Sequence, residues 1–487
     1  MAQLAAVAGA VGAALLLLAR DRLMIVGGLA LRAFAEAGLV ADLSDQRISP
    51  KLLALGAVGV VGMAIGAAVF VRWPMLVTPV VLAAAPFRPP VSFGSEHRFY
   101  IGVVSAGQLG RLLPLYGVLG AAALALAWHA FRGRAVYPVP FVVSVPASAF
   151  LGLAAVSLLW TEDLPAGENV LAYFVLPFAI IVGVVARAPY PPWMTRVLAI
   201  IGVALATLFA VVGIVQAATH ELWFFSPSVE VGNAYSSFFR VTSLFRDPGL
   251  YARHVILGIA ILVVAVLYRK LSPFIALPLV ALLFVGVWFS YSQSSMAALF
   301  VVTLALAIVA GTRSLRIAAS LTALVVLLAA TAFVLVSVQD HSARRATSDR
   351  SRRIEVTLKV VRDHPLVGVG IGSQPLASQR RSEQGGSTNR FVSHTAPLTI
   401  AADLGLLGLA AYLALLAGAA ALIRRVYRLD APLGLGLGAV LLALFVHSLS
   451  YSSGFFEDPI TWFVLGTASS FLLARASMTA HAEILET

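Results

Sequence analysis

The residue best placed to exchange a proton is a histidine at the mouth of an apolar segment. His394 ends a long polar loop, and the chain becomes apolar again from Ala396 onward. An imidazole gains and loses a proton near neutral pH, so a histidine at this boundary can act as a general base. A histidine at a membrane interface can also be an ordinary polar side chain, and its surroundings must decide between the two.

The loop before His394 is strongly basic. Residues 338–393 contain nine arginines and one lysine against five acidic residues, which leaves a net charge of +5. Such an excess predicts a site for an anionic substrate. The alternative is a solvated loop beside anionic lipid headgroups.

Two local patterns predict structure within this loop. Ile354, Leu358 and Val361 follow an i, i+4, i+7 spacing, which predicts a short helix on the membrane surface. His364 and Pro365 should end that helix. The alternating glycines of 366–372 permit tight folding against a ligand or another backbone, but the stretch lacks the GK[ST] ending of a nucleotide-binding P-loop.

The composition requires membrane elements to position these residues. Of 487 residues, 60% are hydrophobic and 11% are charged, against about 25% charged in soluble proteins. A soluble multidomain enzyme is therefore excluded, and thirteen to fifteen transmembrane helices are expected. The absence of cysteine excludes disulfides, thiolate metal sites and cysteine nucleophiles. No His, Asp or Glu cluster has metal-ligand spacing, so no metal or cofactor is predicted.

The net charge of +12 fits basic cytoplasmic loops and contact with lipid headgroups better than nucleic-acid binding. Arginine and lysine recur in alternate short connections, which are predicted to be cytoplasmic. The basic loop would then face outside. We predict transmembrane helices in 1–218, more in 219–337 with an external segment at 219–251, an external loop at 338–396, and a transmembrane and cytoplasmic part at 397–487.

Five stretches resemble the O-antigen ligase and O-antigen polymerase superfamily. HPLVGVG at 364–370, SH at 393–394 and ADLGLLG at 402–408 are similar to its HPLxGxGxG, HNxYL and ELGxxG motifs. RVTSLFRDP at 240–248 and SYSQSS at 290–295 are similar to its RxTGxFxNPN and SxSRG segments. The resemblance covers the second half of the chain, about 240–475.

The resemblance implies an all-α, GT-C-like membrane glycosyltransferase. Its donor would be an undecaprenyl-diphosphate-linked glycan, and its acceptor a glycan or glycolipid at the outer face of the cytoplasmic membrane. His394 would be the base, and Arg353 and Arg240 would bind the donor diphosphate. Arg246 is a further candidate, and Arg352 is an alternative to Arg353. No metal is implied.

This chain departs from the family motifs at three positions. Thr395 replaces the usual Asn after the histidine, Asp403 replaces the usual Glu, and Ser295 replaces the arginine of SxSRG.

Two other functions are compatible with a polytopic membrane protein. A flippase or transporter for lipid-linked oligosaccharides would need ionisable groups near the bilayer midplane, but the expected spans between 252 and 337 contain almost none. A structural or partner-recruiting component of an export complex would have the same fold, but its His394 would have no catalytic role. Ligase and polymerase share the same motifs and stay undistinguished.

Overall fold

The part of the chain that the structure describes is built almost entirely of helices, which confirms the predicted class. The computed structural model describes residues 1–43, 50–87, 92–93, 101–102, 112–223, 225–339, 350–382, 392–393, 395–451 and 454–486. His394 lies outside the described residues.

The described residues of the first part of the chain form nine α-helices. They are α1 (Ala2–Leu18), α2 (Arg22–Leu43), α3 (Pro50–Arg72), α4 (Val77–Ala84), α5 (Leu113–Phe131), α6 (Phe141–Val156), α7 (Leu164–Val170), α8 (Leu176–Val185) and α9 (Met194–Thr219). Short helical turns join some of them: η1 (Pro74–Leu76), η3 (Ser157–Leu159) and η4 (Leu171–Val175). Two-residue strands β1 (Ser92–Phe93) and β2 (Ile101–Gly102) pair antiparallel, with Ser92 opposite Gly102.

The second part contains the long helices and the surface helices around the candidate site. They are α10 (Pro227–Ala234), α11 (Pro248–Leu267), α12 (Pro273–Phe289), α13 (Gln293–Ala310), α14 (Arg313–Gln339), α16 (Arg350–Asp363), α17 (Gln374–Arg381), α18 (Ala396–Leu429), α19 (Ala431–Ser448), η5 (Phe455–Glu457) and α20 (Pro459–Glu486).

Nine helices of the described residues are long and apolar enough to cross a membrane, or ten if α3 and α4, bent by 115°, form one broken span. This is fewer than the thirteen to fifteen expected. Part of the difference comes from α1 and α12, which are apolar but have 17 residues each. A helix of that length is about 26 Å long, close to the minimum for a bilayer.

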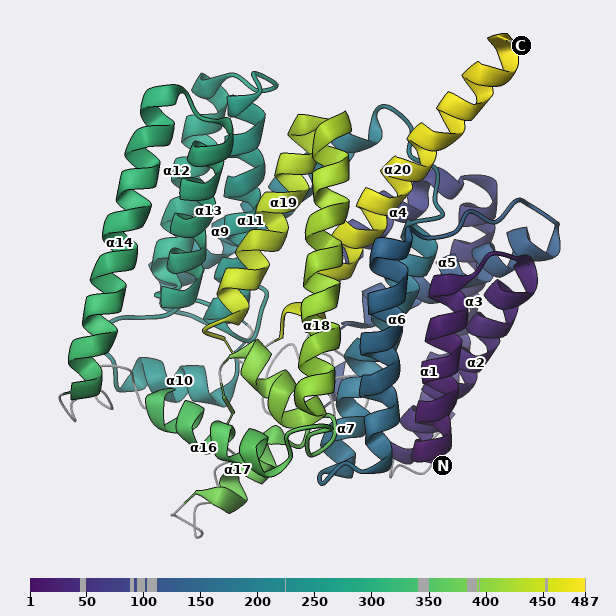
Figure 1. Ribbon diagram of the computed structural model, residues 1–487, viewed down its shortest axis with the longest axis horizontal. Coiled ribbons are helices and arrows are strands. Elements are labelled where there is room, and N and C mark those ends of the chain that lie inside the picture. The colour runs from purple at the N-terminus through teal and green to yellow at the C-terminus, as the bar shows by residue number, and fades with distance from the viewer. Residues whose placement is uncertain are drawn as a thin grey trace.

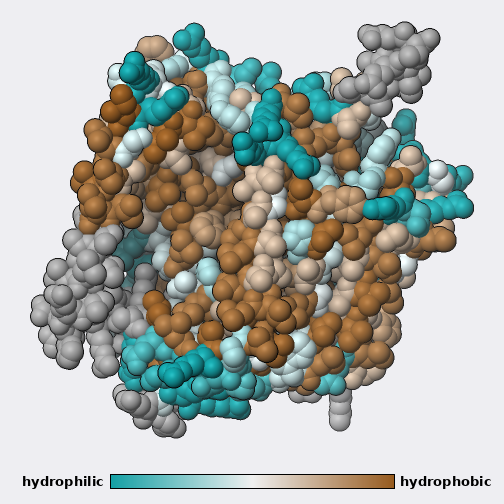
Figure 2. All heavy atoms as spheres, in the orientation of Figure 1, coloured by the Kyte–Doolittle hydropathy of each residue, from teal (hydrophilic) through white to brown (hydrophobic). Residues whose placement is uncertain are grey.

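The helix bundle has two polar ends and an apolar belt. Figure 1 shows α7, α10, α16 and α17 at one end of the long helices, which we call the loop end. The N-terminus lies at the loop end and the C-terminus at the opposite end (Figure 1). Figure 2 shows hydrophilic side chains at both ends and a hydrophobic band between them, as expected of a protein that spans a bilayer.

Two arginines link three short connections at one end of the bundle. The Arg187 guanidinium donates to the main-chain carbonyls of Leu16 and Ala19, at 3.0 and 3.5 Å. Arg20 stacks over the ring of Phe141 with 4.9 Å between its Cζ atom and the ring centroid. The connections after α1, α5 and α8 therefore lie at one end of the bundle.

Aspartate followed closely by proline starts several helices. The carboxylate of Asp247 accepts from two N–H groups of the first turn of α11, at 2.7 and 3.1 Å. Asp430 does the same for α19 at 2.9 Å, and Asp163 for α7 at 3.4 Å. The cap satisfies an N–H group that has no partner within the helix, and proline in the first turn has no N–H to satisfy.

The predicted surface helix exists as α16 and ends before His364, as the His-Pro pair indicated. It lies across the long helices at the loop end (Figure 1). Ile354 and Leu358 are exposed, at 38% and 52%, whereas Val356 and Val360 are buried. Val360 packs in a small cluster with residues of α17 and α18. The helix therefore has a buried face and a separate exposed apolar face.

Candidate active site

Helix α18 is broken at a glycine close to the loop end. Gly405 has φ 66° and ψ −167°, a conformation that is essentially restricted to glycine. The main-chain carbonyls of Ala402 and Asp403, on the N-terminal side of the break, accept N–H bonds from Val369 and Gly370, at 3.0 and 2.8 Å. The donors belong to residues 365–372, which we call the glycine loop.

The glycine loop also provides hydrogen-bond acceptors for the residues on the C-terminal side of the break. The N–H groups of Leu406 and Leu407 donate to the carbonyls of Pro365 and Leu366, at 2.7 and 3.2 Å. Non-helical backbone in a membrane protein must find its hydrogen bonds within the protein. The two sequence motifs at 364–370 and 402–408 therefore supply hydrogen-bond partners for each other's main-chain groups.

The glycine loop is docked on its other side against residues 157–163, at the end of α6. The Ile371 N–H donates to Ser157 Oγ at 3.0 Å, and the Glu162 N–H donates to the Val369 carbonyl at 3.1 Å. Gly370 has φ 91°, and a Cβ atom there would collide with the main chain of Thr161. The sequence analysis did not link this segment to the loop.

Asp403 holds the start of α17. Its carboxylate accepts from the N–H groups of Gly372 and Gln374, at 3.1 and 2.6 Å, and the residue is 5% exposed. A carboxylate is a favourable partner for the unpaired N–H groups at a helix N-terminus. This observation gives the position a structural role that the motif comparison alone did not reveal.

Gln374 connects three elements through its buried side-chain amide. Its Nε2 donates to Thr357 Oγ1 at 3.1 Å and to Ser378 Oγ at 2.8 Å. Its Oε1 accepts from the Ser393 N–H at 3.3 Å. The main chain immediately before His394 is thus attached to both α16 and α17.

Other polar contacts hold the residues on either side of His394. The Val392 carbonyl accepts from Arg353 Nη1 at 3.4 Å. Thr395 donates its N–H to Ser393 Oγ at 3.2 Å, and its hydroxyl donates to the Leu449 carbonyl at 3.4 Å. The predicted diphosphate ligand Arg353 therefore contacts the segment that carries the predicted base. Arg352 lies beside it on α16 and is half-buried.

Arg240 lies in an irregular segment between α10 and α11. Asn233 of α10 accepts the Arg240 N–H on its Oδ1 and donates from its Nδ2 to the Arg240 carbonyl, both at 3.0 Å. Arg240 Nε donates to the Ser290 carbonyl at the end of α12, at 3.3 Å. The two Nη groups make no hydrogen bond to any residue that the structure describes.

Gln216 of α9 holds the residues that follow. Its Oε1 accepts from the N–H groups of Thr242 and Ser243, at 3.1 and 2.7 Å, and its Nε2 donates to the Ser243 carbonyl at 3.0 Å. Arg246, a few residues on, is half-buried. Its Nε has no hydrogen-bond partner among the described residues.

Several other arginines already have acidic partners. Arg253 and Asp458 form a fully buried ion pair of 2.6 Å. Arg381 and Asp363 form a partly exposed pair of 2.7 Å, and the Arg381 hydrogen bond lowers the pKa of the Asp363 carboxyl below its ordinary range. Arg240 has no acidic partner among the residues that the structure describes.

The four predicted arginines lie on two separate segments. Arg352 and Arg353 are on α16, while Arg240 and Arg246 belong to the segment between α10 and α11. Helices α10 and α16 lie at the same end of the bundle (Figure 1). Both pairs therefore belong to segments at the loop end. No group of three His, Asp or Glu side chains suited to a metal ion occurs in the described residues.

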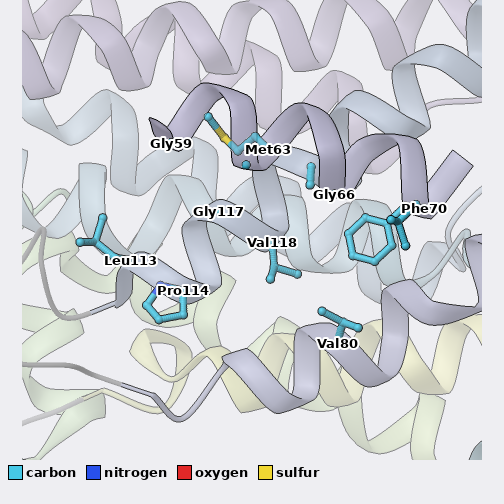
Figure 3. A pocket seen from close by; sticks show the side chains of 12 residues that line it. Gly59, Met63, Gly66, Phe70, Val80, Leu113, Pro114, Gly117 and Val118 are labelled. Carbon is cyan, nitrogen blue, oxygen red and sulfur yellow. The ribbon is translucent and has the colours of Figure 1, made fainter. Parts of the chain in front are cut away.

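A cavity of about 420 Å³ lies between α3, α4 and α5. All twelve lining residues are apolar, glycine or proline, and include Met63, Phe70 and Val118 (Figure 3). Such a lining offers no group that could bind a diphosphate or move a proton. The cavity is therefore no alternative to the site at the loop end.

The fold is that of a polytopic membrane protein, and its predicted arginines belong to segments at one end of the helix bundle. Residues 278–413 match the family model described as O-antigen ligase. The match supports the O-antigen ligase and polymerase superfamily that the motifs indicated. It includes the glycine loop and the break in α18, but neither Arg240 nor residues 157–163. No curated protein matches the chain. The family indicates a glycosyl-transferring enzyme of cell-surface polysaccharide assembly.

Proposed function

We propose that this protein transfers a glycan from an undecaprenyl-diphosphate donor to a sugar hydroxyl at the outer face of the cytoplasmic membrane. The loop end faces the periplasm or cell exterior, and the arginine-bearing connections of the other end face the cytoplasm. The acceptor is a glycan or glycolipid. The reaction inverts the anomeric carbon in a single displacement.

The observation that carries this proposal is the state of Arg240. Three hydrogen bonds hold its main chain and its Nε, while its two Nη groups have no partner among the described residues. A preorganised guanidinium with free N–H groups matches the geometry of a phosphate oxygen pair. Arg253, Arg380 and Arg381, by contrast, pair with acidic side chains.

The chemistry places different demands on the base and on the arginines. The acceptor oxygen attacks the anomeric carbon, the bond from that carbon to the diphosphate oxygen breaks, and His394 takes the hydroxyl proton. Negative charge grows on the departing lipid diphosphate. Arginines fixed in advance stabilise that charge without reorganisation during the reaction. Arg240 and Arg353 have this role in the proposal, supported by Arg246 and Arg352.

Purified full-length protein in nanodiscs tests the proposal, with an undecaprenyl-diphosphate glycan as donor and gel and mass spectrometry as readout. Products with two or more repeats from donor alone identify a polymerase. Transfer only to an added acceptor identifies a ligase. His394→Ala should abolish transfer, and Arg240→Ala should lower kcat/KM for the donor.

The matched control is Arg380→Ala. This arginine also lies at the loop end but pairs with Glu162 at 2.9 Å and is 57% exposed, so its removal should leave transfer unchanged. A wild-type protein that transfers nothing to any acceptor, yet moves labelled donor across a vesicle membrane, would overturn the proposal in favour of a flippase.

A further inference from the structure

The Arg240 main chain is held by a side chain rather than by regular structure. Residues 235–247 form no helix or strand, so their N–H and C=O groups need partners from elsewhere. Asn233 supplies both partners for Arg240 with one amide group. A carboxamide is the side-chain group that can donate and accept side by side in this way. An aspartate would keep only the acceptor, and an alanine would keep neither.

The other fixed point of Arg240 is the C-terminal end of α12. Ser290 is the C-cap of this helix, and the last carbonyls of a helix have no partner within it and carry partial negative charge. Its carbonyl accepts from Arg240 Nε. The main chain of Arg240 is thus fixed by α10 and its Nε by α12. Its two Nη groups make no hydrogen bond to any described residue.

We infer that Asn233 is a positioning residue that sets the place of Arg240 for the donor diphosphate, an inference that rests on the proposed function. Without the amide clamp, the Arg240 main chain loses two hydrogen bonds, and the guanidinium stays attached only through Nε. Asn233 belongs to α10, outside the stretch that matches the family model. The short helix α10 acts as the support of the anion site.

The test is a double-mutant cycle in the full-length protein, with kcat/KM for the lipid-linked donor as readout and the folded fraction measured for every variant. Asn233→Ala should lower kcat/KM by about 10- to 100-fold, since small misplacements of a binding group have effects of this size. The same substitution should have no further effect in an Arg240→Ala background. Asn233→Asp, which retains the acceptor, should fall between wild type and Asn233→Ala.

The control is Asn169→Ala on α7. Asn169 Nδ2 donates to the Pro165 carbonyl of its own helix at 2.7 Å, so its loss should not change kcat/KM. An equal loss of activity from Asn233→Ala with and without Arg240 overturns the inference, because a general structural role is independent of Arg240. Unchanged kcat/KM in both Asn233 variants overturns it as well. If Arg240→Ala transfers the glycan at the wild-type rate, Arg240 does not bind the donor diphosphate. That result overturns the role of Arg240 in the proposed function, and the inference on Asn233 with it.

Discussion

Replacing Gly405 with alanine should disrupt the junction between α18 and the glycine loop. The backbone conformation of Gly405 costs about 1–3 kcal/mol for a residue with a Cβ atom. The new methyl group would also collide with the main chain of Leu366 and Val367. Displacing the loop breaks the bonds that Leu406 and Leu407 donate, worth about 1 kcal/mol each. The expected destabilisation is therefore about 3–5 kcal/mol.

Thermal unfolding of the purified protein, followed by the fluorescence of its seven tryptophans, measures the effect. Gly436→Ala in α19 is the control, because a Cβ atom there meets nothing within 4 Å. Alanine stabilises a helix relative to glycine by up to about 1 kcal/mol, so the control should melt at or above the wild-type temperature. Equal melting temperatures for Gly405→Ala and wild type would refute the assignment of this glycine.

Substitutions at three further contacts can be tested by thermal unfolding. Asp403→Ala leaves the buried N–H group of Gln374 and the part-buried N–H group of Gly372 without an acceptor, at about 1–3 kcal/mol for the buried one and less for the other. Asp403→Asn keeps one acceptor and should lose less. Asp458→Ala leaves Arg253 buried without its acidic partner and should cost about 3–5 kcal/mol, most of which Arg253→Met in the same chain should restore. Arg381→Ala should lower the melting temperature slightly at neutral pH. Because the pKa of Asp363 is lowered in the folded protein, the stabilisation by this pair exists above pH 3.8 and is lost as the pH falls through the lowered pKa, so the effect of the substitution should vanish there.

Local sequence patterns were sufficient where the structure depends on neighbouring residues. The spacing of Ile354 and Leu358 predicted a surface helix, and Pro365 marked its end. The glycines of 366–372 predicted a backbone that can approach another backbone closely, which the contacts with α18 confirm.

Contacts between distant segments left no such pattern. Asn233 and Gln216 are single polar residues whose role depends on a main chain that folds back onto them. In the sequence, Gln374 belongs to a stretch whose only visible feature is its polar composition. In the structure, it begins α17 and is fully buried. A polar residue in the sequence looks the same whether water or a main-chain amide satisfies it.

The docking of the glycine loop on residues 157–163 limits how the chain can be divided. Residues 278–413 carry the recognised motifs, but the loop within them needs hydroxyl and main-chain groups from Ser157 and Glu162. Expressed alone, this stretch would lack the residues that contact one side of its glycine loop. A chimera that exchanges the second half of the chain with that of a relative must therefore bring residues 157–167 with it, because the two halves are parts of one interlocked unit.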